Sequence, residues 1–211
     1  MRKIVLALST MLLASAAHSA IPLYGSPGTR ITDTTYDTYV APSSGIVYAW
    51  FLGKEAQYTS VISMKVNGVT SPESPIFNNQ VTPVPTKAAL GYVQAGDSLE
   101  LLLHILAPPD VAGTIFSSNS ANNPDGFVHI HATPYGGGDL GIPLGTYLYV
   151  GFEDINGARD PNFRNDWDYD DHRFVFEIAP VPEPASWILM IGGFGLVGMS
   201  LRRKTIRSVH A

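Results

Sequence analysis

The sequence predicts an all-β domain, an antiparallel β-sandwich of jelly-roll-like form, placed between an N-terminal signal helix and a single C-terminal transmembrane helix. Three observations predict the sandwich. Short runs of strand length, rich in β-branched and aromatic residues, recur between turn-forming residues. Outside the two termini, no helical period continues for three turns. The 20 glycines and 16 prolines among 211 residues also favour a loop-rich, strand-built domain.

The first 20 residues have the three parts of a secretory signal peptide. The positive residues Arg2 and Lys3 are followed by an apolar run over residues 4–17, and small residues close the segment at Ala17 and Ser19. The apolar run is shorter than the ~20 residues that a membrane span needs, so removal of the segment is favoured over a retained anchor. We therefore expect the chain to be exported.

Residues 21–180 are predicted to form one folded domain. The runs with strand character are residues 45–52, 60–66, 97–105, 126–131, 146–152 and 173–178. Asn67-Gly68, directly after the second run, is a strong signal for a tight turn between strands. The stretches 71–85 and 107–125 are predicted to be long loops rather than domain boundaries, because too few residues lie on either side of them to fold alone.

Acidic residues crowd the end of this domain. The 19 residues from Glu153 to Asp171 contain seven acids and two basic residues, Arg159 and Arg164. Like charges at this density destabilise a compact loop unless a cation neutralises them. Calcium would do so, because it takes six to eight oxygen ligands from carboxylates, amides and carbonyls. The alternative is an acidic loop that only faces water.

Charge and composition exclude several other kinds of partner and site. Residues 21–183 contain all 18 acidic residues but only seven of the 13 basic ones, so this part of the chain repels nucleic acid. The chain has no cysteine, which excludes disulfides, thiolate metal sites and cysteine nucleophiles. An EF-hand is also excluded, because Asp171 stands where the calcium loop needs glycine.

The last 31 residues, 181–211, are predicted to be a tail with three parts. They are the tripeptide Pro182, Glu183 and Pro184, the apolar run 187–201, and the basic cluster Arg202, Arg203 and Lys204. Fifteen apolar or small residues, with their flanks, predict a short transmembrane helix. The basic cluster after it predicts a stop on the cytoplasmic side of the membrane.

This order of parts resembles the PEP-CTERM sorting tail of exported proteins in Gram-negative bacteria. The resemblance implies that an exosortase-type membrane protease processes the chain. It also implies transient or stable anchoring in the inner membrane before processing, and a final place in the cell envelope or extracellular matrix. It describes how the protein is sorted and leaves the role of the domain open.

The acidic segment carries a second resemblance. Gly151-Phe152-Glu153-Asp154, the later run Asp168-Tyr169-Asp170-Asp171, and the strand after it are similar to the DUF4114 family of β-sandwich modules in secreted and adhesin-like proteins. Asp125-Gly126, with His129 or His131, is similar to an upstream part of that family's pattern. The resemblance implies calcium binding, with the candidate ligands Glu153, Asp154, Asp168, Asp170 and Asp171. Asp166 either coordinates the ion or faces water.

These features predict an exported, calcium-stabilised surface module that is not an enzyme. No Gly-x-Ser-x-Gly elbow is present, and Glu153 and Asp154, as neighbours on a strand, would face opposite ways rather than form a glycosidase pair. One alternative is a calcium-dependent, lectin-like module that binds exopolysaccharide or another glycan through an exposed Trp50, Tyr135 or Trp167. A polysaccharide hydrolase is a further alternative.

Overall fold

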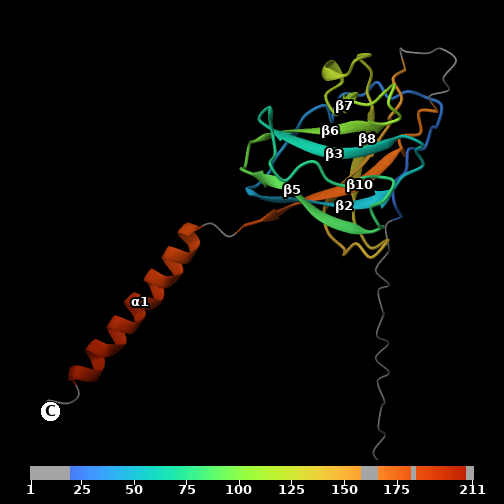
Figure 1. The fold of residues 1–211 in the computed structure, drawn as a ribbon. Coiled ribbons are helices and arrows are strands. Elements are labelled where there is room, and N and C mark those ends of the chain that lie inside the picture. The colour runs from blue at the N-terminus through green and yellow to red at the C-terminus, as the bar shows by residue number, and fades with distance from the viewer. Residues whose placement is uncertain (1–19, 158–165, 182–183, 208–211) are drawn as a thin grey trace, which may run out of the picture.

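The computed structural model describes residues 20–157, 166–181 and 184–207, and ten β-strands form the framework of this part of the chain. They form two antiparallel sheets (Figure 1). In hydrogen-bonded order, the first sheet contains β1 (Tyr39–Val40), β6 (Ser98–Ala107), β3 (Thr59–Val66) and β4 (Val69–Thr70), with β7 (Ile115–Ser117) also paired to β6. The second sheet contains β5 (Thr86–Val93), β2 (Gly45–Gly53), β10 (His172–Pro180), β9 (Tyr147–Phe152) and β8 (Ile130–Tyr135).

The two sheets share one hydrophobic core. Alternate residues of each strand point to the same face of a sheet, and those that point inward form a single buried cluster that includes Phe51, Met64, Leu103, Phe116 and Phe174. A smaller cluster, centred on Trp50, Tyr147 and Tyr149, covers the outer face of the second sheet. A core drawn from both sheets is the arrangement expected of a β-sandwich, whereas the jelly-roll form stays a prediction.

Five of the six predicted strands are confirmed within two residues at each end, and the turn at Asn67-Gly68 is confirmed by positive φ angles of 49° and 82°. The prediction for residues 126–131 is wrong, because β8 begins at Ile130 and continues through Pro134 to Tyr135. Proline is tolerated there because β8 is an edge strand. The predicted runs do not include β5, which follows directly on a proline-rich loop, or the short strands β1, β4 and β7, of which β7 lies inside the predicted loop 107–125.

Helix α1 (Pro184–Arg207) is drawn apart from the two sheets (Figure 1). The large apolar side chains of this helix that the structure describes, among them Trp187, Phe194 and Leu201, are exposed. The predicted transmembrane helix is not supported, because no helix among the described residues combines the length and hydropathy that a span requires. The apolar run has only 15 residues, of which four are glycine, so any longer window takes in polar flanks.

Two other predictions fall mainly outside the described part of the chain. Residues 1–19, which make up nearly all of the predicted signal peptide, are outside it, and so are Pro182 and Glu183 of the tripeptide. Pro184, Arg202, Arg203 and Lys204 lie within α1. The predicted domain limits stay predictions.

Candidate metal centre

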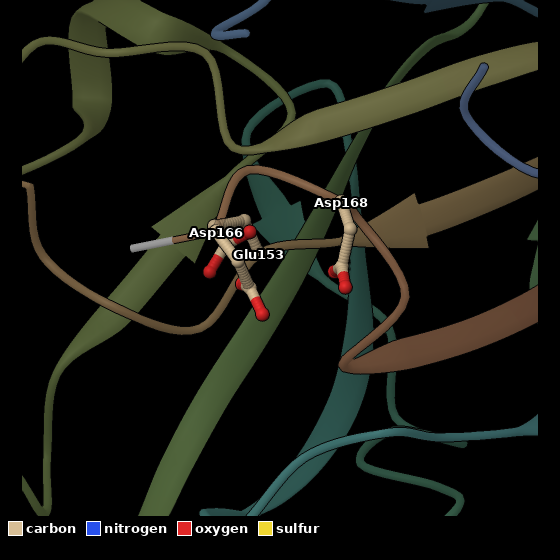
Figure 2. Close-up of side chains that lie close together, drawn as sticks. All are labelled: Glu153, Asp166 and Asp168. Carbon is tan, nitrogen blue, oxygen red and sulfur yellow. The ribbon is translucent and has the colours of Figure 1, made fainter. Parts of the chain in front are cut away.

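Sheet pairing brings the two acidic segments together. Strand β9 ends at Phe152, and Glu153 and Asp154 follow it directly. The second segment, residues 166–171, leads into β10, whose first residue, His172, pairs with Phe152. Two strands that run antiparallel therefore place the exit of one beside the entry of the other. Figure 2 shows the carboxylates of Glu153, Asp166 and Asp168 close together, where β9 ends and β10 begins.

Five carboxylates at this end of β9 and β10 form two groups that share one member. The first group is Glu153, Asp166 and Asp168, and the second is Glu153, Asp154 and Asp171. In each group, one oxygen from every member lies within 4.8 Å of the others. Two oxygens bound to one ion at about 2.4 Å are at most ~4.8 Å apart, so each group meets the distance condition for a shared calcium ion.

Four of the five candidate ligands thus lie in these groups, and Asp170 does not. Its backbone N–H donates to the Asp168 carboxylate at 3.3 Å, and its carbonyl accepts from the Glu55 N–H at 3.0 Å. Asp166, for which the sequence left two possibilities, belongs to the first group and is exposed. The role of these residues as metal ligands stays a prediction.

Glu153 is the central acid of the cluster and is fully buried. Neither of its side-chain oxygens has a hydrogen-bond partner among the described residues, and the same holds for Oδ2 of Asp154. The nearby Asp171 is itself a carboxylate, so it can form a side-chain hydrogen bond with Glu153 only through a proton that one of the two acids carries. One of its oxygens already accepts the Asp154 N–H at 2.8 Å. A buried carboxylate without a donor or a counterion is expensive, so the Glu153 oxygens need a proton or a cation.

Burial and mutual repulsion favour the protonated acids. Loss of water, together with the negative charge of Asp171, raises the pKa of Glu153 to about 10 and that of Asp154 to about 9. Burial also raises the pKa of Asp171 to about 6, against the opposing hydrogen bond from the Asp154 N–H. Without a cation, Glu153 and Asp154 therefore hold protons at neutral pH that the unfolded chain would release.

Tyr169 fixes the second acidic segment from the inside. This residue is fully buried, its hydroxyl donates to the Val128 carbonyl at 3.3 Å, and it accepts the Ile31 N–H at 2.8 Å. Trp167 and Tyr169 have positive φ angles, 47° and 56°, in the left-handed region that non-glycine residues seldom adopt. Strain of this kind clusters at ligand-binding loops, and here it alternates with the acids at 166, 168 and 170.

The segment after the predicted signal peptide covers the same loop. The Gly28 N–H donates to the Asp166 carbonyl at 2.5 Å, and the ring of Tyr24 lies edge-on to that of Tyr169 at 5.0 Å. The guanidinium of Arg30 lies 3.8 Å from the centre of the Phe127 ring. Sequence reasoning missed these contacts, because nothing in the pattern of residues 20–31 relates them to Phe127 or to the acidic loop, which follow far later in the chain.

The buried side chains of a histidine and an aspartate hold the backbone at Glu153. His129 Nδ1 lies 3.0 Å from the Glu153 carbonyl oxygen, and its Nε2 lies 3.0 Å from an Asp125 carboxylate oxygen. Asp125 also accepts the Gly157 N–H at 2.9 Å. Asp125 thereby holds both ends of the segment 153–157, Glu153 through His129 and Gly157 directly. His131 contacts the Pro22 carbonyl instead, with its Nε2 3.3 Å from that oxygen.

Gly151 allows the acidic segment to lie directly against β9. A Cβ atom at this position would collide with the backbone carbonyl of Tyr169. We expect Gly151→Ala to push the loop outward, to cost roughly 1–3 kcal/mol of unfolding free energy, and to weaken any calcium binding. Urea denaturation measures the loss. Gly25→Ala is the matched control, because no atom lies within 4 Å of its Cβ position, and an equal loss in both variants would contradict the packing argument.

Of the aromatic residues considered for glycan binding, two are unsuited to it. Trp50 and Tyr135 are buried in the outer cluster of the second sheet. Trp167 is half-buried beside the acids, with its ring 5.7 Å from that of His129.

Comparison with known proteins identifies the tail. Residues 180–204 match the PEP-CTERM protein-sorting motif. The chain is therefore an exported, envelope-associated protein that an exosortase processes. No curated protein matches the chain significantly. The resemblance of the β domain to DUF4114 is not shown by any family match and stays a prediction.

Proposed function

We propose that the protein is a non-enzymatic module of the Gram-negative cell envelope or exopolysaccharide matrix, whose β-sandwich is stabilised by calcium. The PEP-CTERM motif supports the place of action. The acidic cluster supports the calcium, since five carboxylates converge from the end of β9 and the start of β10. The ion would join these two segments and so complete the fold after export.

The buried Glu153 side chain is the observation that carries this proposal. Its two oxygens are fully buried and lack partners among the described residues, whereas an acid that only faced water would be exposed. Both groups of donors contain oxygen alone, which suits a hard cation such as calcium and not zinc or copper. Calcium supplies positive charge and binds oxygen ligands in flexible geometry. It would therefore neutralise the carboxylates and give the buried Glu153 oxygens a partner.

Calcium is expected to raise the melting temperature of the purified full chain. At a calcium concentration 100-fold above Kd, linkage contributes about 2.7 kcal/mol, or roughly 5–10 °C for a protein of this size. Differential scanning calorimetry in calcium chloride and in EDTA measures the shift. Potassium chloride at equal ionic strength controls for charge screening, which any salt would supply. Equal melting temperatures in calcium and EDTA would contradict the proposal.

A calcium-dependent lectin is the second candidate, and Trp167 is the observation that favours it. This half-buried ring lies between Asp166 and Asp168 in the chain, so a sugar held there would reach both an aromatic surface and the ion. A glycan array probed with the full chain, with and without calcium, tests this function. Binding that is unchanged in Trp167→Ala would exclude this surface.

A further inference from the structure

We propose that the acidic cluster holds two calcium ions and that Glu153 bridges them. This inference rests on the proposed calcium function and goes further by assigning the number of ions and the residues of each site. One ion would be bound by Glu153, Asp166 and Asp168, and the other by Glu153, Asp154 and Asp171. Backbone carbonyls and water would complete the six to eight ligands that calcium takes.

The distances favour two positions over one. Among the described residues, the carboxylates whose oxygens lie within 4.8 Å of one another form two groups of three, and these groups share Glu153 alone. Asp154 and Asp171 are not grouped with Asp166 and Asp168. Because oxygens of one calcium ion are at most about 5 Å apart, two separate positions use all five carboxylates, whereas a single position leaves two of them without the ion.

The unpartnered oxygens of Glu153 fit a bridging role. A carboxylate has two oxygens, and each can bind a different cation. Both Glu153 oxygens are buried and lack hydrogen-bond partners among residues 20–157, 166–181 and 184–207. The other members are engaged in part: Asp168 accepts the Asp170 N–H, and Asp171 accepts the Asp154 N–H. Glu153 therefore has two oxygens available as ligands, one for the ion of each group.

The charge of the cluster also calls for more than one divalent ion. Five ionised carboxylates carry five negative charges, of which a single calcium ion would neutralise two. Within the described residues, none of these five acids forms a salt bridge with lysine or arginine, and Arg173 pairs with Glu55 instead. A second ion would leave one net negative charge, which exposed Asp166 can place in water.

The test is the number of ions bound per chain. Isothermal titration of the full chain with calcium chloride, checked by native mass spectrometry, is expected to give two ions. A value of one would overturn the two-ion inference and leave the proposed calcium function standing. A value of zero would overturn both.

Variants assign the two positions. Asp168→Asn and Asp171→Asn are each expected to bind one ion, because the amide keeps the oxygen that accepts a backbone N–H but loses the charge. Glu153→Gln is expected to bind none, and Asp33→Asn, at an exposed acid outside the cluster, to bind two. Circular dichroism confirms that each variant is folded. One retained ion in Glu153→Gln, or two in either Asp variant, would overturn the bridged arrangement.

Discussion

Replacing Glu153 with glutamine is expected to make the calcium-free protein more stable and to abolish its response to calcium. Folding buries this side chain and raises its pKa from an ordinary 4.5 to about 10, so at pH 7 the folded chain must take up a proton that the unfolded chain has released. This uptake costs roughly 3 kcal/mol at 1.4 kcal/mol per pH unit. Glutamine is neutral and of similar size, so the cost disappears.

The melting temperatures of wild type and variant, in EDTA and in calcium, measure both effects. In EDTA the variant is expected to melt roughly 5–10 °C higher than the wild type. In calcium the wild type gains stability and the variant does not, since its central ligand has lost its charge. A gain in EDTA together with the loss of the calcium response distinguishes a binding site from a structural acid, whose loss would destabilise the protein in both buffers.

Glu177→Gln is the matched control for this substitution. Glu177 lies on β10, outside the cluster, and forms a partly exposed ion pair with Lys87 at 3.5 Å. Such a pair contributes about 0–1 kcal/mol, so the control is expected to show the wild-type calcium response and nearly wild-type stability. A variant at 153 that behaves like this control would contradict the central role of Glu153.

The location of the acidic cluster could be predicted from the sequence, because it depends on local pattern. Glu153 and Asp154 end one apolar run, and Asp168 to Asp171 precede the next. In a sheet where those two runs pair, their acids must meet, and the register of His172 with Phe152 is that pairing. The alternation of aspartates at 166, 168 and 170 was also visible, although it did not separate Asp170 from the other two.

What the sequence could not show depends on contacts between distant residues. His129 contacts the backbone carbonyl of Glu153, and the acidic segment beside it is held by bonds from Tyr169 to Val128 and Ile31, which lie in other parts of the chain. Periodicity has no information about such packing. The prediction for residues 126–131 fails at a place where such contacts also act, since the His129 side chain is held by Asp125 and the Glu153 carbonyl.

The stability of the calcium-free protein is expected to fall as the pH rises above 6.5. The folded-state pKa values of Glu153, about 10, and Asp154, about 9, exceed their ordinary values of 4.5 and 3.8. Between these limits the folded state binds more protons at these two acids than the unfolded state does, so their contribution to stability is greatest at low pH and is lost toward pH 9–10. Each proton held contributes about 1.4 kcal/mol per pH unit.

His172 has the opposite effect on stability, and this effect acts below pH 6.5. Complete burial lowers its pKa from 6.5 to about 3, so the folded state resists protonation and this residue destabilises the protein as the pH falls below 6.5. Its contribution opposes that of the acids between pH 6.5 and 3. Above pH 6.5 His172 is neutral in both states, and the acids alone determine the slope.

Urea denaturation at intervals from pH 6.5 to 8.5, in EDTA and in calcium, measures this dependence. In EDTA the unfolding free energy is expected to fall by at least about 3 kcal/mol across the range, if one extra proton is held throughout. In calcium the decline is expected to vanish, because bound carboxylates are ionised in the folded state as they are in the unfolded chain. An EDTA profile that is flat or rises with pH would contradict a buried, proton-holding cluster. A decline that calcium leaves unchanged would show that the ion does not bind there.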